Sequence, residues 1–105
     1  MRLPDTFTVV QSNGWSVRFR VRTVEGQRTF TDADATGPDG ETMDGDIEDS
    51  EIGSDSFVVT VEWDGGGKGR YVGRRELDGK LNGTTSDVNN PTSQATWFCD
   101  QFIPE

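Results

Sequence analysis

The chain contains no histidine and only one cysteine, Cys99, among its 105 residues. Without imidazole it cannot build a Ser-His-Asp or Cys-His catalytic apparatus or an ordinary zinc site. A single cysteine excludes an intramolecular disulfide, so the hydrophobic core must hold the fold without cystine cross-links. We therefore expect no catalytic residue, no metal ligand and no cofactor, and we predict that the protein is not an enzyme.

Long apolar runs and an excess of positive charge are also missing. No segment approaches the roughly 20 apolar residues of a membrane-spanning helix, so we expect no membrane partner. The net charge of −9 argues against a nucleic-acid partner, because binding to phosphates relies on Lys and Arg. Residues 1–4 are not followed by the apolar run of a signal peptide, which leaves open a cytoplasmic location or export with the leader removed.

What the chain does have is alternation of apolar and polar residues with a period of two. In residues 15–22 and 56–63 every second residue is apolar, which is typical of half-buried strands. The pairs Asn13-Gly14, Glu25-Gly26 and Asp78-Gly79 are turn signals. Counting runs and turns gives about eight short strands, roughly 8–12 residues apart. We predict an all-β fold in which residues 1–105 form one antiparallel up-and-down β-barrel, with a β-sandwich as the alternative.

Several segments carry more specific predictions. A two-residue loop at Glu25-Gly26 would place Val21 opposite Phe30 on the inner face. Residues 89–92 are predicted to end the preceding ladder, and residues 94–103 to form the last strand. Residues 41–55 are ambiguous, because a few apolar residues lie among many acidic ones, and they are interpreted as a poor strand or a long loop.

Charged residues form two further patterns. In residues 32–37, oxygen-bearing side chains and a glycine are spaced as at the start of a calcium-binding loop. However, Met43 stands where such a loop needs a bidentate glutamate. We interpret this stretch as a solvated acidic loop. Arg18, Arg20 and Arg22 form a stripe on the outer face of one strand; they either pair with acidic residues across the sheet or bind an anionic partner.

The predicted hairpin 71–87 has no apolar face. A two-residue loop at Asp78-Gly79 would place Tyr71 opposite Ser86 and Gly73 opposite Thr84. Either face would then carry polar groups into the interior, where each unpaired group costs about 1–3 kcal/mol. Three interpretations stay open: a polar lumen filled by water or ligand, a peripheral hairpin, or a register shifted by one residue.

Trp15, Trp63 and Trp97 each lie at or near the end of a predicted strand. Tryptophan combines a large apolar ring with an N–H donor, so it suits either a ligand cleft at the rim of a barrel or the edge of a core. Together with the polar hairpin, these positions define the candidate ligand-binding residues: Trp63, Tyr71, Asn82, Thr84, Ser86, Asp87 and Trp97.

The short strands, the strand-end tryptophans and the polar hairpin resemble the avidin-like and small calycin (lipocalin-like) β-barrels. Residues 61–63 and 71–73 are similar to the family's apolar strand and the aromatic-glycine strand that follows it, whereas Asn13-Gly14-Trp15 stands where the family has Gly-Thr-Trp. The resemblance implies eight strands that run up and down. Biotin binding is not carried over to this chain.

These observations favour a non-catalytic binding module for a small-molecule or glycan ligand. The alternative is a protein-interaction or inhibitor domain that acts through the acidic surface or the arginine stripe. A third hypothesis, an enzyme with paired carboxylates such as Asp64 and Asp87, has the least support. A homo-oligomer also stays open, with Cys99 on the last strand as a candidate contact.

Overall fold

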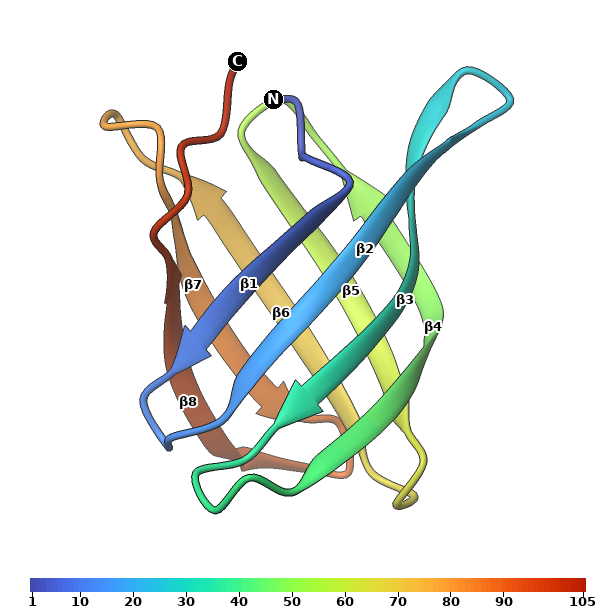
Figure 1. Ribbon diagram of the computed structural model, residues 1–105, viewed down its shortest axis with the longest axis vertical. Coiled ribbons are helices and arrows are strands. Elements are labelled where there is room, and N and C mark those ends of the chain that lie inside the picture. Colours follow the sequence, from blue (N-terminus) through green and yellow to red (C-terminus); the bar gives the residue numbers. More distant parts are fainter.

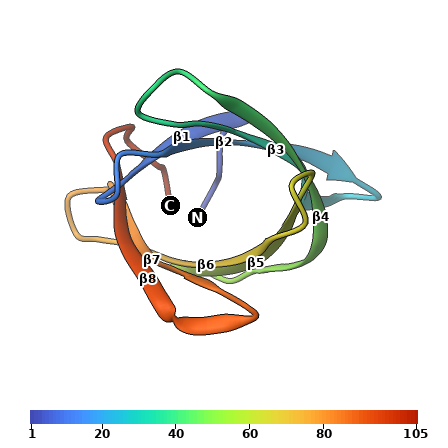
Figure 2. The same cartoon turned by 90° about the horizontal axis from the view of Figure 1, so that it is seen from below.

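The computed structural model describes residues 1–105 and contains eight strands and no helix. The strands follow one another in chain order around a closed antiparallel barrel (Figures 1 and 2). They are β1 (Thr6–Gln11), β2 (Ser16–Val24), β3 (Gln27–Thr36), β4 (Thr42–Ile52), β5 (Ser56–Trp63), β6 (Lys68–Arg75), β7 (Leu81–Asp87) and β8 (Asn90–Cys99). The predicted up-and-down barrel is confirmed, and the sandwich is wrong, because β8 pairs back onto β1 at Val10–Phe98 and Gln11–Trp97.

The interior of the barrel is a packed core built from alternate positions of the strands. In β2, Val17, Phe19 and Val21 are buried, while Arg18 between them is exposed. Aromatic rings fill the centre, with the centroids of contacting pairs 5.2 to 6.0 Å apart; the rings belong to Phe7, Phe19, Phe30, Phe57, Tyr71 and Trp97. A polar lumen along the length of the barrel is therefore excluded.

The hairpin between β2 and β3 confirms its predicted register. Val21 lies opposite Phe30, and the turn residues Glu25 and Gly26 have φ angles of 52° and 81°, as a two-residue type I′ turn requires. The register then shifts by one residue at a β-bulge between Arg20 and Val21. A bulge of this kind keeps apolar residues facing inward on both sides of the extra residue.

Residues 41–55 contain a strand, β4, rather than a long loop. The alternation is weak because the register shifts between Ile47 and Asp49 and because one inward position is a glycine, Gly45. A Cβ atom on Gly45 would lie 2.5 Å from Val61 Cγ1 and 2.7 Å from Trp63 Cε3. The side chains of β5 thus occupy the space that an apolar residue of β4 would normally fill.

The predicted register of the β6–β7 hairpin is wrong by one residue. Tyr71 lies opposite Thr85 instead of Ser86, and Gly73 lies opposite Gly83 instead of Thr84. The cause is the turn: Gly79 donates to the Glu76 carbonyl and has a φ of +85°, which describes a type I turn closed by a left-handed glycine, not a two-residue loop.

This shift gives the hairpin an inner face that suits a core. Leu81, Gly83 and Thr85 turn inward, whereas Asn82 and Thr84 lie exposed on the outer wall. Of the three interpretations that the sequence left open, a register shifted by one residue is confirmed.

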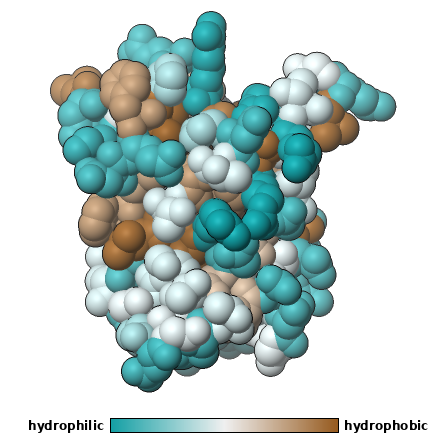
Figure 3. Space-filling model, viewed as in Figure 1, coloured by the Kyte–Doolittle hydropathy of each residue, from teal (hydrophilic) through white to brown (hydrophobic).

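Residues 32–36 of the acidic stretch belong to β3, so the prediction of a solvated loop over 32–37 is wrong. Asp34 lies 3.1 Å from Arg18 and 3.0 Å from Arg20, and Arg20 also pairs with Asp32 across β2 and β3. The cross-strand interpretation of the arginine stripe is confirmed for these two arginines, and the face of β2 and β3 in Figure 3 is accordingly hydrophilic. The paired carboxylates raise the pKa of Arg20.

The last strand begins earlier and ends earlier than predicted. Residues 88–89 make the turn, so β8 starts at Asn90 instead of after residue 92 and ends at Cys99. The Cys99 side chain is 1% exposed, and burial raises the pKa of its thiol. Cys99 therefore does not lie on the surface where a contact between copies would need it.

Candidate functional site

The two ends of the barrel differ. At one end, called the closed end, the two terminal segments lie across the opening: Arg2 N donates to Pro104 O (2.8 Å) and Ile103 N to Gly79 O (2.7 Å). Leu3 and Ile103 are buried there and close the core. The other end, called the open end, is formed by the loops at residues 12–15, 37–41, 64–67 and 88–89 (Figure 1).

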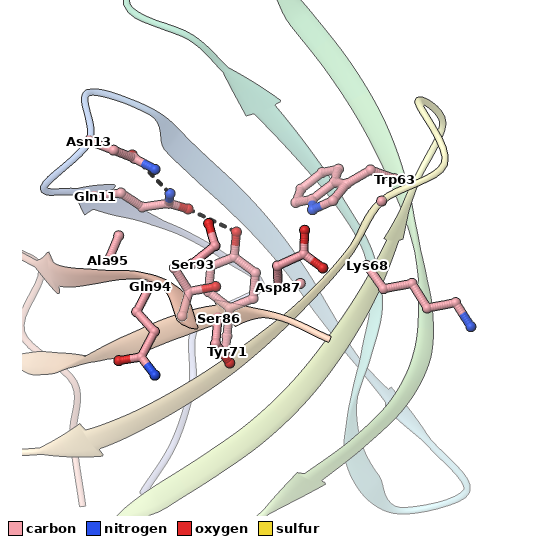
Figure 4. Close-up of a pocket in the computed structure, with 13 residues that line it drawn as sticks. Gln11, Asn13, Trp63, Lys68, Tyr71, Ser86, Asp87, Ser93, Gln94 and Ala95 are labelled. Atoms are coloured by element: carbon pink, nitrogen blue, oxygen red, sulfur yellow. Dashed lines mark hydrogen bonds between the residues drawn. The ribbon is translucent and has the colours of Figure 1, made fainter. Parts of the chain in front are cut away.

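The open end holds a pocket of about 190 Å³, to which β1, β5, β6, β7 and β8 contribute (Figure 4). Its lining residues are Gln11, Asn13, Trp63, Gly67, Lys68, Gly69, Tyr71, Thr85, Ser86, Asp87, Ser93, Gln94 and Ala95. Ten of these thirteen are not hydrophobic, and the aromatic rings of Trp63 and Tyr71 supply most of the apolar lining. Such a combination of few aromatics with convergent polar groups is typical of small-ligand sites.

A chain of hydrogen bonds fixes the inner wall of this pocket. The Tyr71 hydroxyl donates to Gln11 Oε1 at 2.8 Å, and Gln11 Nε2 donates to Asn13 Oδ1 at 3.1 Å. The Trp15 backbone N–H donates to the same Asn13 oxygen, which ties the chain to the β1–β2 turn. Burial raises the pKa of Tyr71 to about 12, and the neighbouring Thr85 hydroxyl opposes the rise.

Trp63 is the last residue of β5, and its indole ring reaches across to β6. The ring fits because β6 carries Gly69 beneath it: a Cβ atom there would lie 3.4 Å from Trp63 Nε1 and 3.2 Å from Tyr71 Cε1. The indole N–H is solvent-accessible and makes no hydrogen bond within the protein. It is therefore free to donate to a molecule in the pocket.

Asp87 is the last residue of β7 and lies directly opposite Gly69. Its Oδ1 atom accepts the backbone N–H groups of Asn89 (2.8 Å) and Asn90 (3.2 Å), which fixes the carboxylate and the turn at 88–89. The second oxygen has no partner in the protein. Figure 4 shows the Asp87 carboxylate and the Trp63 indole nitrogen turned toward each other across the opening.

Lys68 lines the same pocket, but its ammonium group is engaged elsewhere. Nζ lies 3.0 Å from Glu48 and 3.8 Å from Glu62, and these carboxylates raise the pKa of the ammonium. Figure 4 shows the side chain extending away from the opening. Lys68 therefore adds aliphatic surface to the rim and little positive charge to the pocket.

A smaller apolar crevice of about 100 Å³ adjoins this pocket on the other side of Trp63. It shares Gln11, Trp63 and Tyr71 with the first pocket and adds apolar side chains from the β1–β2 turn and from β2 to β4, namely Trp15, Val17, Ala35 and Met43. The open end thus offers a polar compartment next to an apolar one.

Of the seven residues proposed from the sequence, the structure brings four to the pocket: Trp63, Tyr71, Ser86 and Asp87. Asn82 and Thr84 lie instead on the outer wall of β7, because the register differs by one residue from the predicted one. Trp97 lies in the core, 3% exposed, with its indole N–H donating to Thr84 O at 3.0 Å.

Several lining residues were not predicted from the sequence. Thr85 would have been placed inward by the correct turn type at residues 76–80. Gln11 occupies an inward position of β1 just before the Asn-Gly turn, which is the one sequence signal that could have indicated it. Ser93 lies in β8 but precedes the predicted last strand, and Gln94 was predicted as the first residue of that strand without being expected to line a pocket.

Two other features of the molecule bear on function. Asp64 lines a different hollow from Asp87, beside Trp15 and Met43, so the structure does not bring the two carboxylates into one pocket. No group of three or more Cys, Asp or Glu residues gathers in an arrangement that could hold a metal ion. The structure contains no helix with the length and apolarity of a membrane crossing.

Comparison of the chain with protein-family models, with curated protein sequences and with solved structures gave no match.

Proposed function

We propose that the protein is a binding module that holds a small polar ligand, such as a single sugar unit, at the open end of the barrel. The observation that carries this proposal is the asymmetry of the two ends. One end is closed by buried apolar residues, whereas the other presents an aromatic-lined pocket with unpaired hydrogen-bonding groups. An avidin-like or calycin-like barrel, which the sequence resembles, would offer a ligand site of this kind.

The size of the pocket limits the ligand. A volume of about 190 Å³ corresponds to roughly six water molecules at about 30 Å³ each. This is less than the roughly 300–1,000 Å³ of sites for drug-sized molecules. The pocket therefore suits one sugar ring, a small metabolite or the terminal unit of a longer chain.

The lining favours recognition through hydrogen bonds and aromatic contact together. Trp63 offers a ring and an N–H group, and Asp87 offers one free carboxylate oxygen that its turn holds in place. Because these groups are fixed before binding, little ordering of side chains opposes association.

The test is a calorimetric and tryptophan-fluorescence titration against a panel of monosaccharides and small polar metabolites. We expect at least one compound to bind, and the Trp63→Ala variant to lose at least tenfold in affinity. Thr84→Ala is the matched control, because Thr84 is polar, adjacent in sequence to Thr85 and exposed on the outer wall. Equal loss in both variants, or no binding to any compound, would overturn the proposal.

A second candidate is a protein-interaction surface on the acidic outer face. Asp44 and Asp46 of β4 lie directly opposite Asp34 and Asp32 of β3, and Asp46 also lies opposite Glu62 of β5. Asp44 and Asp46 form no ion pair. A basic peptide such as oligolysine would gain these carboxylates as partners. Its binding should weaken steeply with salt and be lost in a D44N/D46N variant; binding that neither change affects would dismiss this candidate.

A further inference from the structure

The charge at the open end restricts the ligand further than its size does. The loops and strand ends that surround the opening carry acidic residues at five positions: Asp39, Glu41, Asp44, Asp64 and Asp87. Of the two basic residues near the start of β6, Lys68 is paired with Glu48 and Glu62, and Arg70 lies on the outer face of the strand. An anionic ligand would therefore meet repulsion that no free cation in the pocket offsets, while a cation would be attracted.

Among the lining groups that have no partner within the protein, two are complementary in charge and hydrogen bonding. The second oxygen of Asp87 can only accept hydrogen bonds when the carboxylate is ionised, and the indole N–H of Trp63 can only donate one. Both groups flank Gly69, which has no side chain: Asp87 lies opposite it, and Trp63 Nε1 lies 3.4 Å from the place of its missing Cβ atom. The space above Gly69 is therefore bordered by one anionic acceptor and one neutral donor.

The hydrogen-bonding groups deeper in the pocket are already satisfied by one another. The Tyr71 hydroxyl uses its proton on Gln11, and Gln11 uses its amide on Asn13. The Tyr71 ring also stays neutral over the ordinary pH range, because burial raises its pKa to about 12. Asp87 thus carries the only net charge that faces a ligand, since Lys68 points away.

We infer that the ligand is a small amine with a neighbouring hydroxyl, as in an amino sugar, whose ammonium group donates to Asp87 and whose hydroxyl oxygen accepts the Trp63 indole N–H. This inference rests on the proposed function and names the ligand class of the same pocket. A charge-assisted hydrogen bond to a fixed carboxylate is roughly twice as strong as a neutral one.

The test compares three sugars that differ at one position: glucosamine, glucose and N-acetylglucosamine. Isothermal titration at neutral pH and low salt should show glucosamine binding at least tenfold more tightly than the two uncharged sugars. The preference should shrink when salt is added, because the charges lie near solvent.

Asp87→Asn is the decisive variant, because asparagine keeps the Oδ1 acceptor for Asn89 and Asn90 while removing the charge. We expect the preference for glucosamine to fall to less than twofold. Asp64→Asn removes an equal charge at the same end of the barrel without touching the pocket, so it should retain most of the preference.

The outcomes separate this inference from the proposed function. If all three sugars bind equally and Trp63→Ala abolishes their binding, the pocket is a ligand site but the inference is overturned. If glucosamine does not bind at millimolar concentration while an uncharged compound of the panel binds in the pocket, the inference again fails and the proposed function stands. If no compound binds, both fail. A preference that Asp64→Asn removes as fully as Asp87→Asn would assign it to the general charge and overturn the role of Asp87.

Discussion

Gly73 of β6 and Gly83 of β7 are paired side by side on neighbouring strands, and together they make room for the indole ring of Trp97. A Cβ atom on Gly73 would lie 2.7 Å from Trp97 Cη2, and one on Gly83 would lie 2.7 Å from Trp97 Cζ2. The ring also stacks on Phe57, with the centroids 5.8 Å apart. This glycine pair explains how a hairpin of small and polar residues can border an aromatic core.

Alanine at either glycine should therefore destabilise the fold. We expect a cost of about 1–3 kcal/mol from overpacking, and more for Gly83→Ala than for Gly73→Ala. The reason for the difference is that a Cβ atom on Gly83 would also overlap the backbone oxygen of Val72, which cannot move as a side chain can. Urea denaturation measures the effect. Gly67→Ala is the control, since no atom lies within 4 Å of its added Cβ; an equal loss in all three variants would contradict this explanation.

Trp97 and Trp63 should respond differently to truncation. Trp97→Ala leaves a cavity in the core and should cost about 3–5 kcal/mol. Trp63 is only half-buried at the rim, so Trp63→Ala should cost clearly less. Thermal denaturation followed by circular dichroism checks the order. A larger loss for Trp63→Ala would mean that Trp63 supports the core instead of the pocket.

The strand architecture was predictable because local patterns decide it. Alternation in residues 15–22 and 56–63 depends only on one buried and one exposed face, and the Glu25-Gly26 turn fixes the pairing of Val21 with Phe30. Barrel closure rests on only two residue pairs between β1 and β8. Such long-range pairing leaves no mark in the sequence of either strand.

The composition of the candidate site was only partly predictable, for a related reason. A one-residue change in register exchanges the two faces of a strand. Because the turn type at Gly79 was predicted wrongly, Thr84 was expected in the pocket and Thr85 was not, whereas the structure has Thr85 inside and Thr84 outside. Trp63 and Asp87 escaped the error because strand ends point to the rim in either register. Trp97 did not, because the glycines that admit its ring lie on other strands.

The buried tyrosine should make stability fall in alkaline solution. Tyr71 has its pKa raised from 10.0 to about 12 in the folded state, so it ionises first in the unfolded chain as pH rises. Its contribution is fully present below pH 10 and should be lost between pH 10 and about 12, a loss of roughly 3 kcal/mol at about 1.36 kcal/mol per pKa unit. Because the chain has one tyrosine, absorbance of tyrosinate reports this residue alone. A titration midpoint near 10 in the folded protein would contradict the burial of its hydroxyl, and Tyr71→Phe corrects for the lysines and arginines that also titrate.

The free thiol should be inert in the folded protein. Cys99 is 1% exposed and burial raises the pKa of its thiol, so little reactive thiolate is accessible at pH 8. We expect labelling by Ellman's reagent to be at least 100-fold slower in the native protein than in guanidinium chloride. Sedimentation should be the same with and without reductant. Fast stoichiometric labelling, or a dimer that dithiothreitol dissociates, would show that β8 opens in solution.

Removing a negative charge from the acidic face of β3, β4 and β5 should stabilise the barrel. Asp46 lies between Asp32 and Glu62 on neighbouring strands, and like charges directly opposite each other destabilise a sheet by about 0.2–1 kcal/mol per pair. Asp46→Asn should therefore stabilise the barrel by several tenths of a kcal/mol at low salt, and the gain should shrink in high salt because the repulsion is screened. Asp39→Asn is the matched control, since Asp39 is an exposed loop residue without an ion pair or a cross-strand partner. If Asp46→Asn destabilises the barrel instead, the carboxylate is held by a cation in solution, and the acidic face is then better explained as a binding surface than as a source of repulsion.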